Sequence, residues 1–194
     1  MKPSSQQFGD NSAQNWVNAF TRTLNAFAYL CEAMIHKNMG LRYVDASAPF
    51  ALLVLVFYPI FWPEHDLRAY TVFAGLFLLA HIGQRIKAYR RRINGDANHS
   101  YYAGDPLLWA WFPWMSGRTL RLLVEPFIVL LIGGIVVYYD RPLGVLFMVS
   151  AVAMNVTNEQ QERRERERVH AMHDALLENQ MAADRFRGWY GDGN

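Results

Sequence analysis

The sequence has little cysteine and contains none of the short motifs that mark common enzymes. Its 194 residues include a single cysteine, Cys31, which excludes an internal disulfide framework and suits a reducing compartment. There is no zinc-protease His-Glu-x-x-His, no Gly-x-Ser-x-Gly, no phosphate-binding loop, no dinucleotide fingerprint and no Cys-x-x-Cys. The sequence therefore predicts a non-enzymatic protein without a catalytic residue, a metal site or a cofactor.

A secretory signal and a strong net charge are also missing. The first ten residues are polar, and no apolar core with a small-residue cleavage site follows them. The formal net charge is only +2, whereas nucleic-acid binding needs a basic surface that is not compensated by acidic residues. Nucleic acid is therefore not an expected partner.

Charge is nearly absent from four apolar stretches, residues 46–62, 67–83, 120–139 and 142–156. Each approaches the roughly 17 to 20 residues that a helix needs to cross the hydrocarbon of a bilayer. The stretches come in two pairs, 46–83 and 120–157, and each pair is joined by a turn short enough for a hairpin. The predicted fold class is an all-α membrane protein with four transmembrane helices arranged as two helical hairpins.

The distribution of basic residues predicts the orientation of these spans. The two hairpin turns hold only Arg68 and Arg141, and the other 17 of the 19 Lys and Arg residues lie outside the turns. Positively charged flanks stay on the cytoplasmic side during insertion. We therefore expect a multi-pass protein of the bacterial inner (cytoplasmic) membrane, with both termini and the loop at residues 84–119 in the cytoplasm.

The segments outside the hairpins differ from one another. Residues 1–12 are polar and are predicted to form a mobile leader. In the region 13–45, Trp16, Phe20, Leu24 and further apolar residues recur every three to four positions, which predicts an amphipathic helix. Its apolar stripe could lie in the membrane interface or against another part of the protein or a partner. Residues 158–194 predict a charged cytoplasmic helix and tail.

Three polar residues lie within the apolar stretches, namely His81, Glu125 and Asn155. All three fall near the predicted cytoplasmic ends. An ionisable group inside a membrane is a candidate functional residue, because burying it without a partner is costly. The favoured explanation is a structural contact between His81 and Glu125, or between Glu125 and a nearby arginine. The alternative is a small transporter or membrane-embedded enzyme that uses His81 and Glu125 with the loop residues His99 and Asp105.

Small residues in the middle of the spans indicate close helix packing. Gly75, Gly133 and Gly134 occupy such positions, and small side chains let membrane helices approach each other closely. The contact could be within one chain or between copies, so a homo-oligomer is a candidate assembly.

Two further segments are candidate interfaces. The first is an aromatic cluster in the central loop, formed by Trp109, Trp111, Phe112 and Trp114. It could lie in the headgroup region as a short half-buried helix or could serve as a docking patch for a protein. The second is a seam at heptad spacing in the C-terminal helix, formed by Val169, Met172, Leu176 and Phe186.

These features together predict a membrane anchor or scaffold subunit of a multiprotein assembly. Its expected partners are membrane lipids and other membrane or cytoplasmic proteins. The layout, with two hairpins, very short outer turns and elaborate cytoplasmic segments, is in the style of small inner-membrane components of bacterial secretion and conjugation machines. That comparison concerns layout alone.

Overall fold

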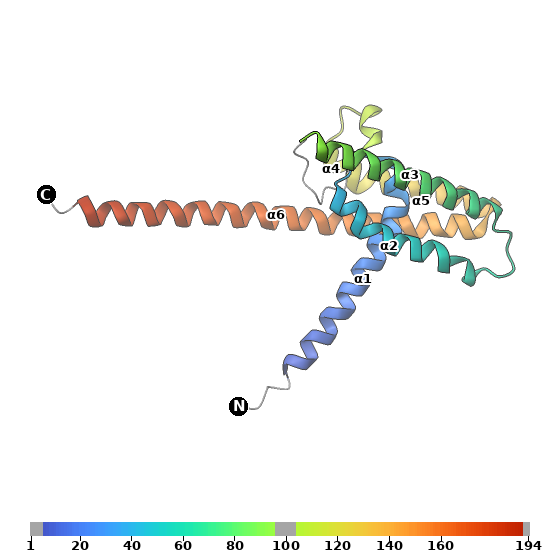
Figure 1. The fold of residues 1–194 in the computed structure, drawn as a ribbon, viewed down its shortest axis with the longest axis horizontal. Helices are drawn as coiled ribbons and strands as arrows, with labels where there is room; N and C mark the ends of the chain where they lie inside the picture. The colour runs from blue at the N-terminus through green and yellow to red at the C-terminus, as the bar shows by residue number, and fades with distance from the viewer. Residues whose placement is uncertain (1–5, 96–103, 192–194) are drawn as a thin grey trace. The chain divides into compact units, whose positions relative to one another are not determined.

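The computed structural model of the chain describes residues 6–95 and 104–191, with side chains for residues 14–95 and 104–186. The chain divides into two compact units, residues 1–157 and residues 158–194. The helices of the first unit are α1 (Gln6–Ile35), α2 (Leu41–Phe57), α3 (Arg68–Ile93), α4 (Gly117–Thr119), α5 (Glu125–Tyr139) and the first part of α6 (Arg141–Gly191), shown in Figure 1.

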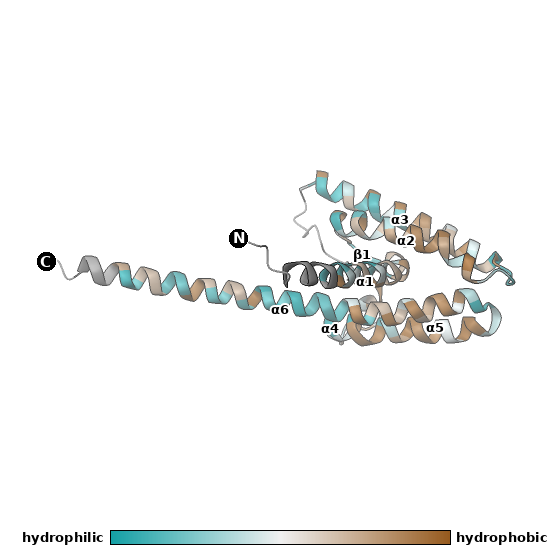
Figure 2. Cartoon of the chain, turned by 90° about the horizontal axis from the view of Figure 1, so that it is seen from below, coloured by the Kyte–Doolittle hydropathy of each residue, from teal (hydrophilic) through white to brown (hydrophobic). Residues whose placement is uncertain are grey.

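Within the described residues, three helical stretches are long and apolar enough to cross a membrane, namely Leu41–Phe61, Arg68–Ile93 and Gly117–Tyr139. Three of the four predicted apolar stretches lie in these helices. The fourth, residues 142–156, begins α6 and is not one of the three. Figure 2 shows hydrophobic residues concentrated in the middle of α2, α3 and α5 and in the first part of α6.

Short irregular helices modify two of these stretches. Tyr58–Phe61 forms a 3-10 turn, η1, at the end of α2, because Pro59 has no N–H to continue the α-helical hydrogen bonding. Leu120–Val124 forms a π-helical turn, η3, between α4 and α5. A π turn inserts an extra residue into the helix and often marks a functional position, and this one ends directly before Glu125.

The C-terminal half of α1 is the centre of the first unit. One core cluster joins Tyr29 and Leu30 of α1 to residues of α2, α3 and α6, and a second joins Ala28 and Cys31 to α5 and α6. In Figure 2, α1 accordingly lies between the α2–α3 pair and the α5–α6 pair. Small residues on this segment, such as Ala26 and Ala33, allow helices to pack closely on both sides.

The two halves of the expected amphipathic helix lie in different environments. Its C-terminal half is buried within the chain, whereas Trp16, Val17 and Phe20 in the preceding turns are exposed. The helix also begins at Gln6 and ends at Ile35, so residues 6–12 of the predicted leader are helical. Residues 1–5 lie outside the described part of the chain.

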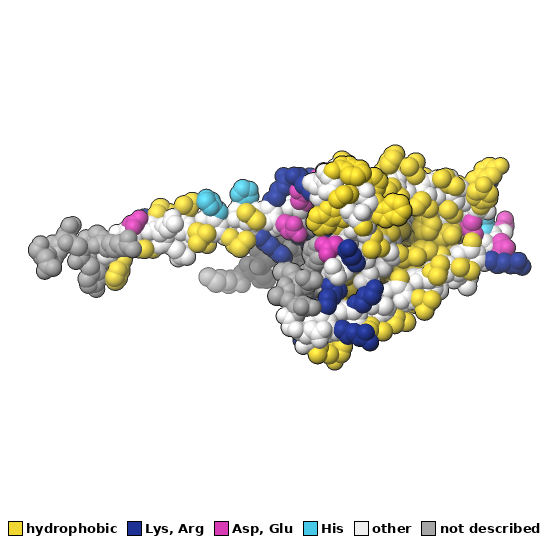
Figure 3. Space-filling view, turned by 90° about the horizontal axis from the view of Figure 1, so that it is seen from above, with side chains coloured by type: hydrophobic (Ala, Val, Ile, Leu, Met, Phe, Trp, Pro, Cys, Tyr) yellow, Lys and Arg dark blue, Asp and Glu magenta, His cyan; other side chains and the backbone are white. Residues whose placement is uncertain are grey.

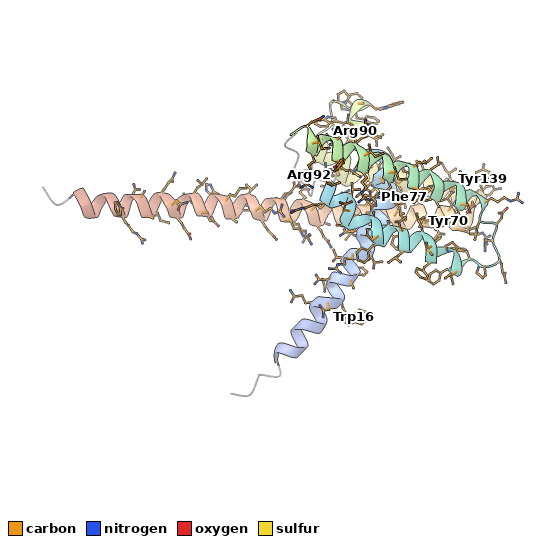
Figure 4. All side chains as sticks on the ribbon, viewed as in Figure 1. Trp16, Tyr70, Phe77, Arg90, Arg92 and Tyr139 are labelled. Atoms are coloured by element: carbon orange, nitrogen blue, oxygen red, sulfur yellow. The ribbon has the colours of Figure 1, made fainter. Side chains whose placement is uncertain are left out.

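The charged ends of the predicted spans are helical as well. α3 continues past Gly83 to Ile93, and Arg90, Arg91 and Arg92 occupy its last turn. Cations in the last turn interact favourably with the negative end of the helix dipole. Figure 4 places Arg90 and Arg92 at one end of the bundle and Tyr139 at the opposite end, with Phe77 in its interior.

A two-residue antiparallel pairing attaches the central loop to the end of α1. β1 (His36–Lys37) pairs with β2 (Asp105–Pro106), with His36 opposite Pro106. Gly104 precedes β2 with a φ of +99°, and a Cβ there would lie 2.6 Å from the carbonyl oxygen of Lys37. Only glycine fits both the backbone conformation and this close approach.

The second unit, residues 158–194, is described as the continuation of α6 to Gly191. Its described side chains beyond Gln161 are nearly all exposed. Arg163 and Arg166 pair with Glu159 and Glu162 one turn earlier, at N–O distances of 2.6 and 3.0 Å. Such pairs at a spacing of four residues support a helix in water.

Candidate functional site

A buried acid–histidine pair joins α5 to the end of α1. His36 Nε2 and Glu125 Oε2 are 2.8 Å apart, and both side chains are fully buried. The π turn η3 precedes Glu125, and β1 holds His36, so the pair depends on the two irregular parts of the backbone. A buried carboxylate needs such a partner, because an unpaired buried charge is very unfavourable.

A second buried carboxyl lies one helical turn before His36. Glu32 is fully buried, and its Oε2 accepts a hydrogen bond from the hydroxyl of Tyr43 on α2. Burial raises the pKa of Glu32 above its ordinary value, and the charge of Glu125 acts in the same direction, while His36 and Tyr43 oppose the rise. The proton on Glu32 is therefore bound more tightly than on an exposed glutamate.

Side chains of α3 complete the polar shell around the end of α1. Gln84 Nε2 donates to the carbonyl oxygens of His36 at 2.5 Å and Ala33 at 3.3 Å. These bonds satisfy carbonyls that a helix end leaves without intrahelical partners. Arg91 Nη2 donates to the Met39 carbonyl at 2.9 Å in the same way.

A neighbouring contact connects His81 to α1. The Tyr29 hydroxyl and His81 Nδ1 are 2.9 Å apart, and the His81 ring also stacks on Phe77. From the sequence we expected Glu125 to contact either His81 or a nearby arginine. The structure instead gives His81 the partner Tyr29 and gives Glu125 the partner His36.

The cluster of Glu32, His36, Tyr43, Gln84 and Glu125 is called the acid–histidine cluster below. Glu32 Oε1 and Glu125 Oε1 are buried and accept no hydrogen bond from the described residues. Among those residues no three His, Cys, Asp or Glu side chains are placed to hold a metal ion. The side chains of the cluster can form hydrogen bonds and can bind or release protons.

The other predicted polar residues are distributed differently. Asn155 Nδ2 donates to the Leu122 carbonyl at 3.0 Å, which links α6 to η3. Asp105 Oδ2 accepts from Asn38 Nδ2 at 2.9 Å and so lies at the β1–β2 pairing. His99 lies outside the described residues. Among the described residues of the alternative hypothesis, His81, Glu125 and Asp105 have the hydrogen-bond partners Tyr29, His36 and Asn38, respectively.

The three predicted packing glycines also differ from one another. A Cβ on Gly133 would lie 3.0 Å from Met148, so Gly133 faces α6 within the chain. A Cβ on Gly75 or Gly134 would meet nothing within 4 Å. Gly144 of α6, which was not among the predicted packing glycines, is packed more tightly than Gly133, because a Cβ there would overlap the backbone of Val137 on α5.

Both predicted interface segments present exposed apolar side chains. In the central loop, the 3-10 turn η2 (Leu107–Ala110) contains Trp109 and is followed by Trp111 and Trp114, and all three tryptophans are exposed. Phe112 is half-buried and contacts Trp114 edge-to-face. The four seam residues of the C-terminal helix each have between 60% and 63% of their surface exposed, namely Val169, Met172, Leu176 and Phe186.

Sequence reasoning missed most of the acid–histidine cluster. It did not single out Glu32, His36, Tyr43 or Gln84. One signal was available, since Glu32 and His36 are four residues apart at the end of a stretch rich in Ala, Leu and Met. Two ionisable residues on one face of a helix segment destined for burial need a buried partner.

Comparison of the chain with protein-family models, curated proteins and solved structures found no match.

Proposed function

We propose that the protein is a non-enzymatic, multi-span anchor or scaffold subunit of a multiprotein assembly in the bacterial inner membrane. The observation that carries this proposal is the exposed seam of Val169, Met172, Leu176 and Phe186 on the second unit. A helix in water normally buries its apolar stripe against another element. Here Val169, Met172 and Leu176 each have at least 60% of their surface exposed, which supports a role for the seam in binding a partner protein.

The sequence of the second unit supports a recognition helix. Its proximal part carries the ion pairs Glu159–Arg163 and Glu162–Arg166, which stabilise a helix without tertiary packing. In its distal part Val169, Met172 and Leu176 follow one another at spacings of three and four residues, and Phe186 falls on the same heptad seam beyond the polar Asn179. This is the pattern of a helix that packs against a second helix. The exposed tryptophans at residues 109, 111 and 114 offer a second surface for the same assembly.

Truncation after Arg168 should abolish complex formation without affecting membrane insertion. The truncated chain keeps every apolar stretch and the basic residues beside them, but it loses the whole seam. Co-purification of partners from cross-linked membranes measures the effect. A matched pair of point variants refines it, since Leu176→Arg changes the seam and Ala175→Arg places the same charge beside it. Unchanged partners in the truncated protein would contradict the proposal.

Four spans with both termini in the cytoplasm form the topology proposed with this function. The basic residues support it, because the turn at residues 63–66 has no Lys or Arg, the turn at residues 140–141 has only Arg141, and Arg68 lies just after the first turn. Figure 3 shows charged side chains gathered at the two ends of an apolar surface on the first unit. In this topology residues 142–156 of α6 provide the fourth span.

Labelling of introduced cysteines should report this topology. In a Cys31→Ala background, cysteine at Glu64 or Tyr139 should react with an impermeant thiol reagent added to intact cells, whereas cysteine at Asn94 or Asn179 should react only after lysis. Removing Cys31 is a precaution, since burial already raises the pKa of its thiol to about 12 and suppresses the reactive thiolate. The opposite labelling pattern would overturn the orientation.

A small transporter or membrane-embedded enzyme is the second candidate, and the fully buried pair of His36 and Glu125 favours it. Glu125→Gln separates the two functions. Glutamine still offers an oxygen to His36 but cannot release a proton. A scaffold should keep its partners in this variant, whereas a proton-coupled activity should be lost while the protein stays folded.

A further inference from the structure

An apolar groove of about 550 Å³ lies between α3 and the α5–α6 pair. Cys31, Met34 and Ile35 of α1 line it at one end, and residues of α3, α5 and α6 line the rest. All of its lining side chains are apolar. Its volume falls within the roughly 300 to 1,000 Å³ of pockets that bind small molecules.

The groove opens sideways onto the lipid-facing surface of the proposed spans. Val72, Leu76 and Ile132 line the groove and are also exposed, with 63%, 49% and 46% of their surface accessible. A flexible hydrocarbon chain can enter from the bilayer through such an opening without crossing a polar barrier. An apolar lining offers no hydrogen-bond partner to a polar ligand, so the groove selects a hydrocarbon.

A polar pocket of about 480 Å³ adjoins the groove at the hairpin turns. Ala69 lines both, and Pro142 of the polar pocket is followed in the chain by Leu143 of the groove. The hydroxyl-bearing side chains Tyr138 and Tyr139 also line the polar pocket. One amphipathic molecule can therefore occupy the two spaces at once, with its apolar part between the helices and its polar part between the turns.

The charges of the polar pocket are balanced. It is lined by Arg68 and Arg141 and by Asp66 and Asp140, with His65 beside them. Arg68 Nε and Asp66 Oδ2 are 3.6 Å apart, and both side chains are largely exposed, so this pair is weak and can be exchanged for other partners. A headgroup with both a phosphate and an amine matches such a lining, whereas a purely anionic headgroup would also meet two carboxylates.

We propose that the groove and the polar pocket together bind one phospholipid with an amine-bearing, zwitterionic headgroup. One acyl chain lies in the groove, the phosphate contacts Arg68 and Arg141, and the amine contacts Asp66 and Asp140. The site rests on the membrane spans of the proposed function but not on partner recognition by the second unit. Loss of partners in the truncated protein would therefore leave lipid binding unchanged.

Native mass spectrometry of the full-length protein tests the site. The protein is stripped of lipid by detergent washing and offered phosphatidylethanolamine or phosphatidylglycerol with identical acyl chains. We expect one bound phosphatidylethanolamine per chain. Ile132→Trp fills the groove and should weaken binding by about tenfold or more. Leu131→Trp is the matched control, because Leu131 is similarly exposed but does not line the groove, and it should bind as the wild type does.

A second pair of variants controls for misfolding of the Ile132→Trp protein. Val72→Trp should repeat the loss, and Leu79→Trp, on the same helix but outside the groove, should not. The double variant Asp66→Asn and Asp140→Asn leaves the pocket positively charged and should shift the preference to phosphatidylglycerol. Equal binding by the groove variants and their controls, or no single-lipid complex, would overturn the proposal. Equal binding of the two lipids by the wild type would overturn its headgroup assignment.

Discussion

Replacing Glu125 by alanine is expected to lower the free energy of unfolding by about 3 to 5 kcal/mol, because the substitution removes one partner of a fully buried, hydrogen-bonded pair of ionisable side chains. The His36 ring, 2.8 Å from Glu125 Oε2, loses this carboxylate while it stays buried in the core. Contacts between η3–α5 and the end of α1 should loosen. Denaturant titration in detergent, followed by circular dichroism, measures the change.

Two further variants define what the Glu125→Ala result means. Glu125→Gln keeps an oxygen toward His36 and should cost only about 1 kcal/mol, as expected for weakening one hydrogen bond. Glu159→Ala removes an exposed ion pair with Arg163 and should change stability by less than about 1 kcal/mol. If Glu125→Ala were as mild as Glu159→Ala, the buried pair would not hold α5 to α1.

Replacing Gly144 by alanine is expected to destabilise the protein by about 2 to 3 kcal/mol through overpacking. The new methyl group would lie 2.2 Å from the backbone nitrogen of Val137, and backbone cannot move aside as a flexible side chain can. The hairpin is also tight, since Asp140 alone separates α5 from α6. Its Oδ1 accepts from the Leu143 N–H at 2.8 Å, which fixes the start of α6.

Gly134→Ala is the matched control for this prediction. Gly134 is also helical, but a Cβ there meets nothing within 4 Å. Alanine has a higher helix propensity than glycine, so this variant should be neutral or more stable by up to about 1 kcal/mol. Thermal unfolding in the same detergent compares the two. A larger loss from Gly134→Ala would place Gly134 at an interface between copies of the chain.

Much of the helical architecture could be predicted from the sequence. The apolar stretches at residues 46–62, 67–83 and 120–139 correspond to helices that are long and apolar enough to cross a membrane. They could be predicted because a span must be apolar along its whole length, so the local composition identifies it. The helix boundaries were less accurate. Charged continuations such as residues 84–93 of α3 are helical without being apolar, so composition does not mark where they end.

The candidate site was only partly predictable. Glu125 stood out by itself, since a carboxylate in an apolar stretch always needs an explanation. Its partner did not, because His36 lies 89 positions away along the chain and has no unusual local context. The burial of Glu32 was not predicted either. A helical wheel assumes that one face meets solvent, whereas α1 has helices on both sides of its buried half.

The sequence by itself determined the apolar helices, the basic ends and the exposed seam of the C-terminal helix, because each of these is set by neighbours within a few turns. Only the tertiary structure decided that α1 lies between the two helix pairs, that Gly144 rather than Gly134 is the close contact of α5 and α6, and that a groove adjoins a polar pocket at the turns. These features arise from contacts between segments far apart in the chain, and side-chain periodicity carries no information about which faces will meet.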